Sequence, residues 1–122
     1  MNVQALSAVV FHSPDPDRLG DFYRRHLGIP FEHRSHGPIR DHLEAWFEGV
    51  HFAIRKGAAR AGQGGGGVSP TFRVQGIDTF VETLTTEGVA LKHKVADLGN
   101  GKRLVSFRDV DGNLFSLIDL GW

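Results

Sequence analysis

Residues 6–28 read LSAVVFHSPDPDRLGDFYRRHLG and decide the fold, because they join a strand-like run to an amphipathic helix. The run Leu6–His12 is rich in the β-branched and aromatic residues typical of strands. Asp15 followed by Pro16 is typical of a helix N-cap with proline in the first turn. Apolar residues then recur at helical spacing as far as Gly28, which predicts a helix that ends there.

The second half of the chain repeats this organisation. Thr71–Val74 is strand-like, and apolar residues within Ile77–Leu84 follow the i, i+3, i+4, i+7 spacing of a helix. Phe11 and Phe72 occupy matching places in the two strand-like runs and lie 61 residues apart. An internal duplication of this kind predicts two similar structural modules in one chain.

Three further strand-like runs follow each predicted helix. In sequence order they are Phe31–Arg34, His42–Phe47 and His51–Lys56, then Leu91–Val95, Arg103–Arg108 and Leu114–Leu120. The turns Glu48-Gly49 and Asp111-Gly112 precede the last run of each half, lie 63 residues apart and are typical of hairpins. The segment His33–His42, which overlaps two of these runs, is rich in charged residues, and we expect an exposed loop there. The pattern predicts an α+β fold of two βαβββ modules.

The length of 122 residues favours one domain, residues 1–122, built from both modules. Residues 57–67, GAARAGQGGGG, are typical of a flexible linker and separate the modules at about 1–57 and 68–122. The glycines of this linker also match G-x-G-x-x-G, but a strand-like run follows them in place of a helix, which excludes dinucleotide binding.

Composition excludes several classes of function. Lys+Arg 14 and Asp+Glu 14 cancel, so the charge does not favour nucleic acid or an anionic membrane as a partner. The absence of cysteine excludes disulfides, thiolate nucleophiles and cysteine-ligated metals. The first residues lack the pattern of a signal peptide, and the apolar stretches are too short to span a membrane. We therefore expect a soluble cytoplasmic protein.

Two motifs carry a resemblance to a known family. Ser13-Pro14-Asp15, Phe22-Tyr23 and Leu27-Gly28 make up the first, and Asp109–Phe115, DVDGNLF, is the second. Together with the duplication, they resemble the glyoxalase/bleomycin resistance protein/dioxygenase, or vicinal oxygen chelate, superfamily over nearly the whole chain. The resemblance implies two modules whose curved sheets enclose a ligand cavity, a homodimer, and in the enzymes a divalent metal held by His and Glu.

The family's metal-ligand positions fall on residues that bind metals poorly. Carried over one by one, these positions are Ala8, Ala53, Ser69 and Ser116. Methyl groups cannot coordinate a metal, and serine hydroxyls bind transition metals poorly beside imidazole or carboxylate. We therefore expect no bound metal and no other cofactor.

Strand alternation predicts which side chains share a face with those four positions. The ligand-binding candidates on that face are His12, Trp46, His51, Arg55, Arg73 and Ser116. Arginine and histidine would anchor an anionic or carbonyl group, and Trp46 would stack on a planar ligand or instead fill a core or dimer interface. The side chains on the opposite face of these strands are apolar and suit packing against a helix.

These residues leave more than one function open. The first is a small-molecule-binding protein of the bleomycin-resistance type, which sequesters an aromatic or anionic ligand without the family metal. The second is a glyoxalase- or dioxygenase-like enzyme in which His12, His42, Glu44 and His51 form a displaced metal site or a metal-free histidine transfers protons. The third is a structural or regulatory module. We expect binding without catalysis.

Overall fold

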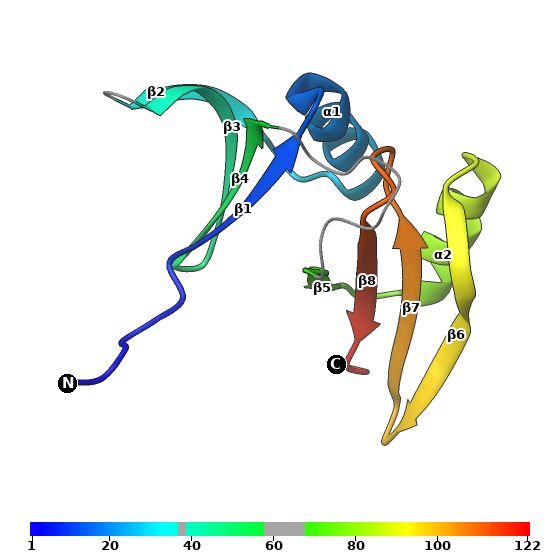
Figure 1. Ribbon diagram of the computed structural model, residues 1–122. Helices are drawn as coiled ribbons and strands as arrows, with labels where there is room; N and C mark the ends of the chain where they lie inside the picture. Colours follow the sequence, from blue (N-terminus) through cyan, green and yellow to red (C-terminus); the bar gives the residue numbers. More distant parts are fainter. Residues whose placement is uncertain (37–38, 58–67) are drawn as a thin grey trace. The chain divides into compact units, whose positions relative to one another are not determined.

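The computed structural model describes residues 1–36, 39–57 and 68–122. The chain forms two compact units, residues 1–59 and 60–122 (Figure 1). Each unit contains one helix and one four-stranded mixed sheet, so the predicted α+β class and the repeated βαβββ order are confirmed. Except for Gly57, the predicted linker 57–67 lies outside the described residues.

The first unit has its strands in the order β1-β4-β3-β2. Its elements are β1 (Ala8–Ser13), α1 (Pro16–Leu27), β2 (Glu32–His36), β3 (Ile39–Phe47) and β4 (Val50–Lys56). β1 runs parallel to β4, and the other neighbours are antiparallel. The exposed loop expected over residues 33–42 is wrong, because residues 33–36 and 39–42 belong to the paired strands β2 and β3. Pairing with a neighbouring strand outweighs the low strand propensity of these polar residues.

The predicted N-cap and C-terminal glycine of α1 are confirmed. The Asp15 carboxylate accepts a hydrogen bond from the Arg18 backbone N–H at 3.2 Å, and Pro16 lies in the first turn. Gly28 ends the helix in the left-handed conformation, with φ of 67°, and its N–H donates to the Arg24 carbonyl.

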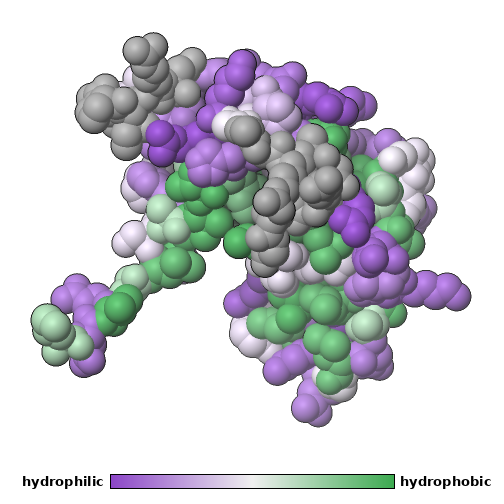
Figure 2. Space-filling view, viewed as in Figure 1, coloured by the Kyte–Doolittle hydropathy of each residue, from purple (hydrophilic) through white to green (hydrophobic). Residues whose placement is uncertain are grey.

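α1 covers one face of the first sheet. Leu19 and Tyr23 are fully buried on the helix, and Phe52 of β4 lies in ring contact with Tyr23. Gly20 allows the helix to approach β3 closely, because a Cβ at this position would collide with the Leu43 side chain. Met1–Ser7 precede β1, which begins two residues later than predicted, and their apolar side chains are exposed (Figure 2).

The second unit repeats the arrangement in the order β5-β8-β7-β6. Its elements are β5 (Thr71–Arg73), α2 (Ile77–Thr86), β6 (Ala90–Gly99), β7 (Lys102–Arg108) and β8 (Leu114–Asp119). Phe11 pairs with Ile54 in the first unit, and Phe72 pairs with Leu117 in the second. The sequence offsets of 61 and 63 therefore correspond to equivalent strand registers. Among the described residues, neither helix has the length and apolar character needed to cross a membrane.

The start of α2 depends on a residue far away in sequence. Gly76 occupies the N-cap position and has no side chain to cap the helix. Asp119, at the end of β8, accepts hydrogen bonds from the N–H groups of Gly76 and Ile77 at 3.0 and 3.2 Å. Hydrogen bonds from the backbone N–H groups of Gly121, Ile77 and Gly76 lower the pKa of Asp119.

Candidate ligand-binding site

The first sheet has a polar face opposite the face that α1 covers. On β3, Leu43 packs toward the helix, whereas His42 and Glu44 alternate to the other side. We call this side the polar face; its side chains are His12, Glu32, Arg34, His42, Glu44, Trp46, His51, Ala53 and Arg55. The face brings predicted site residues from three strands onto one surface.

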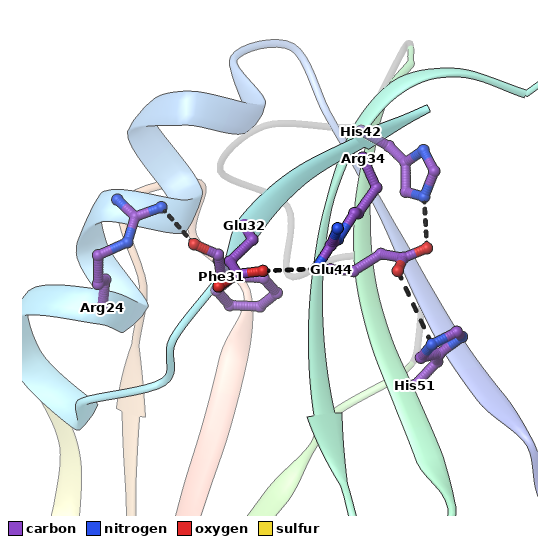
Figure 3. Close-up of polar contacts among 7 residues, drawn as sticks. All are labelled: Arg24, Phe31, Glu32, Arg34, His42, Glu44 and His51. Atoms are coloured by element: carbon purple, nitrogen blue, oxygen red, sulfur yellow. Dashed lines mark hydrogen bonds and ion pairs between the residues drawn. The ribbon is translucent and has the colours of Figure 1, made fainter. Parts of the chain in front are cut away.

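Glu44 lies at the centre of a cluster on this face that consists of the buried His42 and Glu44 and the half-buried His51. His42 Nε2 lies 2.7 Å from Glu44 Oε1, and the two side chains are 5% and 7% exposed. When the carboxylate is ionised it can only accept, so the His42 ring donates this hydrogen bond. His51 approaches the same carboxylate from β4, so that two imidazoles converge on one carboxylate (Figure 3).

The His51 ring has an unsatisfied nitrogen. Its Nε2 lies 3.8 Å from Glu44 Oε2, which is too far for a hydrogen bond. Within the described residues this nitrogen is shielded from solvent and has no hydrogen-bond partner. Trp46 lies directly across from His51 on β3, and the two rings are in contact. The Trp46 side chain is itself exposed.

His12 does not join this cluster. It lies on β1 across from Arg55 of β4, whereas His42 lies on β3 across from Arg34 of β2. β4 separates the strands of His12 and His42, so these residues are about 10 Å apart at two strand spacings. The four residues proposed for a displaced metal site thus include three that converge and one that does not. The described part of the chain contains no group of three or more His, Asp or Glu side chains placed to hold a metal ion.

Two cavities border the part of the first sheet that the structure describes. A small one of about 170 Å³ lies along β2 and β3 on the polar face and is lined in part by Arg34, Glu44 and Trp46. A larger one of about 460 Å³ lies at the start of α1, where Asp17 pairs with His33 at 3.1 Å. The smaller cavity is beside the Glu44 cluster, and we therefore treat it as part of the candidate site.

The corresponding face of the second unit has different chemistry. Ser106 on β7 and Ser116 on β8 are buried opposite each other, with their hydroxyl oxygens 2.7 Å apart. The Arg73 guanidinium lies 4.4 Å from the centre of the Trp122 ring, a cation–π contact. A cavity of about 290 Å³ lies beside Trp122.

The structure describes all four positions that the resemblance assigns to metal ligands. Ala8 and Ser69 are exposed, and Ala53 and Ser116 are buried. The Ser116 hydroxyl is already hydrogen-bonded to Ser106, which further reduces its value as a ligand. These positions offer one hydroxyl in a pair, one exposed hydroxyl and two methyl groups, a set that does not fit a divalent metal.

Three residues near these faces escaped the sequence analysis. Ser106 could have been found from the hairpin register, because it lies across from Ser116. Arg34 shares the polar face but was treated as part of a loop. Trp122 follows the last strand, where alternation no longer predicts a direction, so sequence reasoning gave no signal for its contact with Arg73.

Comparison with known proteins supports the fold. Residues 5–117 match the profile of the Glyoxalase/Bleomycin resistance protein/Dioxygenase superfamily. No curated protein matches the chain.

Three similar solved structures share this fold. Two of them are named for antibiotic binding or for fosfomycin resistance. TnmS3, an antibiotic binding protein from Streptomyces sp. CB03234, has a TM-score of 0.74 and 18% identity, covering 98% of both chains. The fosfomycin resistance protein FosX from Listeria monocytogenes has a TM-score of 0.73 and 19% identity, covering 97% of this chain and 94% of its own. TioX from Micromonospora sp. ML1 has a TM-score of 0.72 and 20% identity, covering 95% of this chain and 98% of its own. At these identities the likeness establishes the fold.

Proposed function

The chain belongs to the Glyoxalase/Bleomycin resistance protein/Dioxygenase superfamily, and we propose that it binds an aromatic small molecule without chemical conversion and without the family metal. The proposal rests on the side chains at the four positions where the superfamily's enzymes hold their metal. Ala8, Ala53, Ser69 and Ser116 supply no strong metal ligand, and the Ser116 hydroxyl is hydrogen-bonded within the protein.

Two aromatic surfaces support an aromatic ligand. Trp46 is 64% exposed beside the Glu44 cluster, and Trp122 is 69% exposed and stacked on Arg73. Exposed indole rings can contribute a large contact area to a planar ligand. Arg55 on the first sheet and Arg73 on the second are exposed cations, and each would anchor an acidic group of a ligand bound on its own sheet. The similar structure named an antibiotic binding protein supports the same class of function.

A thermal-shift screen of aromatic compounds, followed by mass spectrometry of each compound after incubation, tests the proposal. We expect hits that raise the unfolding temperature and are recovered unchanged from protein free of metal by elemental analysis. The substitution Trp46→Ala should abolish the shift of ligands bound at the first unit. Phe47→Ala is the matched control, because Phe47 is the next residue on β3 and points to the opposite face. Stoichiometric metal in tag-free protein would contradict the proposal, and binding equal in both variants for every hit would contradict a site at Trp46.

A second candidate function is a metal-free enzyme that uses a histidine for proton transfer. The observation that favours it is the His51 ring nitrogen, which lies beside a buried carboxylate without a hydrogen-bond partner in the described chain. A histidine oriented by a carboxylate is a common general base. Conversion of a bound compound that disappears in the variant His51→Asn would select this function over simple binding.

A further inference from the structure

The Glu44 carboxylate and the His51 ring are separated by a gap that a single hydrogen-bonding atom of a ligand would fill. Glu44 Oε2 and His51 Nε2 are 3.8 Å apart, whereas a direct hydrogen bond needs about 2.7–3.2 Å. Buried polar atoms are nearly always hydrogen-bonded, so an unsatisfied ring nitrogen in a folded protein calls for an explanation. A single oxygen atom placed about 2.8 Å from both atoms would close the gap.

The charges on either side of the gap decide what that oxygen must do. An ionised Glu44 carboxylate only accepts hydrogen bonds, and a histidine ring N–H such as that of His51 can donate one. The bridging group must therefore donate to Glu44 and accept from His51. A hydroxyl does both, an ether cannot donate, and an ammonium group cannot accept. A ligand carboxylate has no proton to donate to the Glu44 carboxylate, so it cannot form this bridge.

Trp46 lies beside the gap, on the cavity and against the His51 ring. The indole contacts the His51 ring, whose Nε2 is buried, and 64% of Trp46 is exposed. Exposed side chains change rotamer readily, so the indole can turn aside and then stack on the ligand. The adjacent cavity of about 170 Å³ is smaller than the roughly 300–1,000 Å³ of sites that enclose drug-sized ligands. It therefore suits one small ring system and not a whole large ligand.

We propose that the polar face recognises a neutral hydroxylated aromatic group, whose hydroxyl bridges Glu44 and His51 while its ring stacks on Trp46. This inference rests on the proposed function and assigns the ligand chemistry of its first unit. It places selectivity for a phenol-type hydroxyl at Glu44 and His51, two residues that lie outside the four metal-ligand positions of the superfamily.

Isothermal titration calorimetry at neutral pH with four naphthalene probes tests the inference. The probes are 2-naphthol, its methyl ether, 2-naphthoate and 2-(aminomethyl)naphthalene, which share the ring and differ in the polar group. A hydrogen bond to a charged group predicts that the naphthol binds about tenfold to a hundredfold more tightly than the ether. We expect the naphthoate and the amine to bind more weakly than the naphthol.

Two substitutions locate the selectivity. Glu44→Gln and His51→Asn should reduce naphthol binding to the level of the ether and leave ether binding unchanged, which a merely structural effect would not do. Glu82→Gln on α2 and His93→Asn on β6 are matched controls, because both residues are exposed in the other unit. Both controls should keep the preference for the naphthol.

The possible failures can be told apart. Equal affinity of wild-type protein for the naphthol and its ether overturns the hydroxyl site but leaves the proposed binding of aromatic molecules intact. Tighter binding of the amine or the naphthoate than of the naphthol also overturns it. Absence of binding by all four probes counts against both the hydroxyl site and an aromatic ligand. The probe comparison in wild-type protein decides the matter even if a variant fails to fold.

Discussion

The hydrogen bond between His42 and Glu44 should be a strong contributor to the stability of the first unit. The two atoms are 2.7 Å apart, and the side chains are only 5% and 7% exposed. Removing either partner leaves the other polar group in a poorly solvated position, which typically costs about 1–3 kcal/mol, or more for a charged group. We therefore expect His42→Leu and Glu44→Met each to lower the free energy of unfolding by at least about 2 kcal/mol.

The double variant should cost less than the sum of the two single variants. Replacing both partners with apolar groups of similar shape removes the unsatisfied atom, and this can be nearly neutral. A coupling energy of about 1.5–3 kcal/mol is expected for this charge-assisted pair. Glu32 and Arg34 form the matched control on the neighbouring strand, at the same 2.7 Å but with side chains 65% and 52% exposed. The coupling there should be only about 0.2–1 kcal/mol.

Urea unfolding followed by circular dichroism, applied to both double-mutant cycles, measures these couplings. The reasoning is refuted if the His42–Glu44 coupling falls below about 0.5 kcal/mol, the usual limit of additivity. It is also refuted if the exposed Glu32–Arg34 pair couples as strongly as the buried one. Equal couplings would mean that burial does not govern the strength of polar pairs on this face.

Three other predictions test different parts of the molecule. Because backbone hydrogen bonds lower the pKa of Asp119 in the folded state, its stabilising effect is present above about pH 4 and is lost as the pH falls below that value. Thermal melts should therefore show Asp119→Asn less stable than wild type at neutral pH but less sensitive to acid. Exhaustive chelation should leave the melting temperature unchanged, since the metal-ligand positions hold Ala8, Ala53, Ser69 and Ser116; a drop on chelation would contradict this. Light scattering at micromolar concentration should give the mass of a homodimer, since Met1, Val3 and Leu6 expose apolar surface; a monomer mass would contradict it.

Local signals in the sequence were sufficient for most of the fold. The Asp15-Pro16 cap and Gly28 act through neighbouring backbone atoms, so the residue types alone indicate where α1 begins and ends. Strand alternation likewise separates the apolar side of each sheet from the polar side, because successive side chains point to opposite faces. The matching offsets of Phe11 and Phe72 then predict equivalent strand registers, which the pairings confirm.

Long-range contacts account for most of what the sequence did not reveal. Asp119 caps α2 across more than forty residues, and no local pattern identifies such a cap. The convergence of His42, Glu44 and His51 depends on how β3 and β4 pair, which sets the separation of side chains on different strands. One omission was local: Asn100-Gly101 is a strong hairpin signal, and with Asn100 at φ of 55° it joins β6 to β7. This signal predicts that β6 continues to Gly99 and that β7 begins at Lys102, so that both strands are longer than the predicted runs.

Equivalent positions in the two units explain why their faces differ. Glu44 lies across from Ala53, and Ser106 lies across from Ser116, so Glu44 and Ser106 are counterparts in the duplicated fold. In the second unit two short hydroxyls satisfy each other and leave little for a ligand to complete.

In the first unit the methyl group of Ala53 offers no hydrogen bond, and the longer side chain of Glu44 must find its partners elsewhere on the face. His42 satisfies one carboxylate oxygen at 2.7 Å, whereas His51 stays 3.8 Å from the other. The methyl group at position 53 thus leaves the Glu44 carboxylate facing His51 across a gap of 3.8 Å, and this gap is where we propose selective recognition in the first unit.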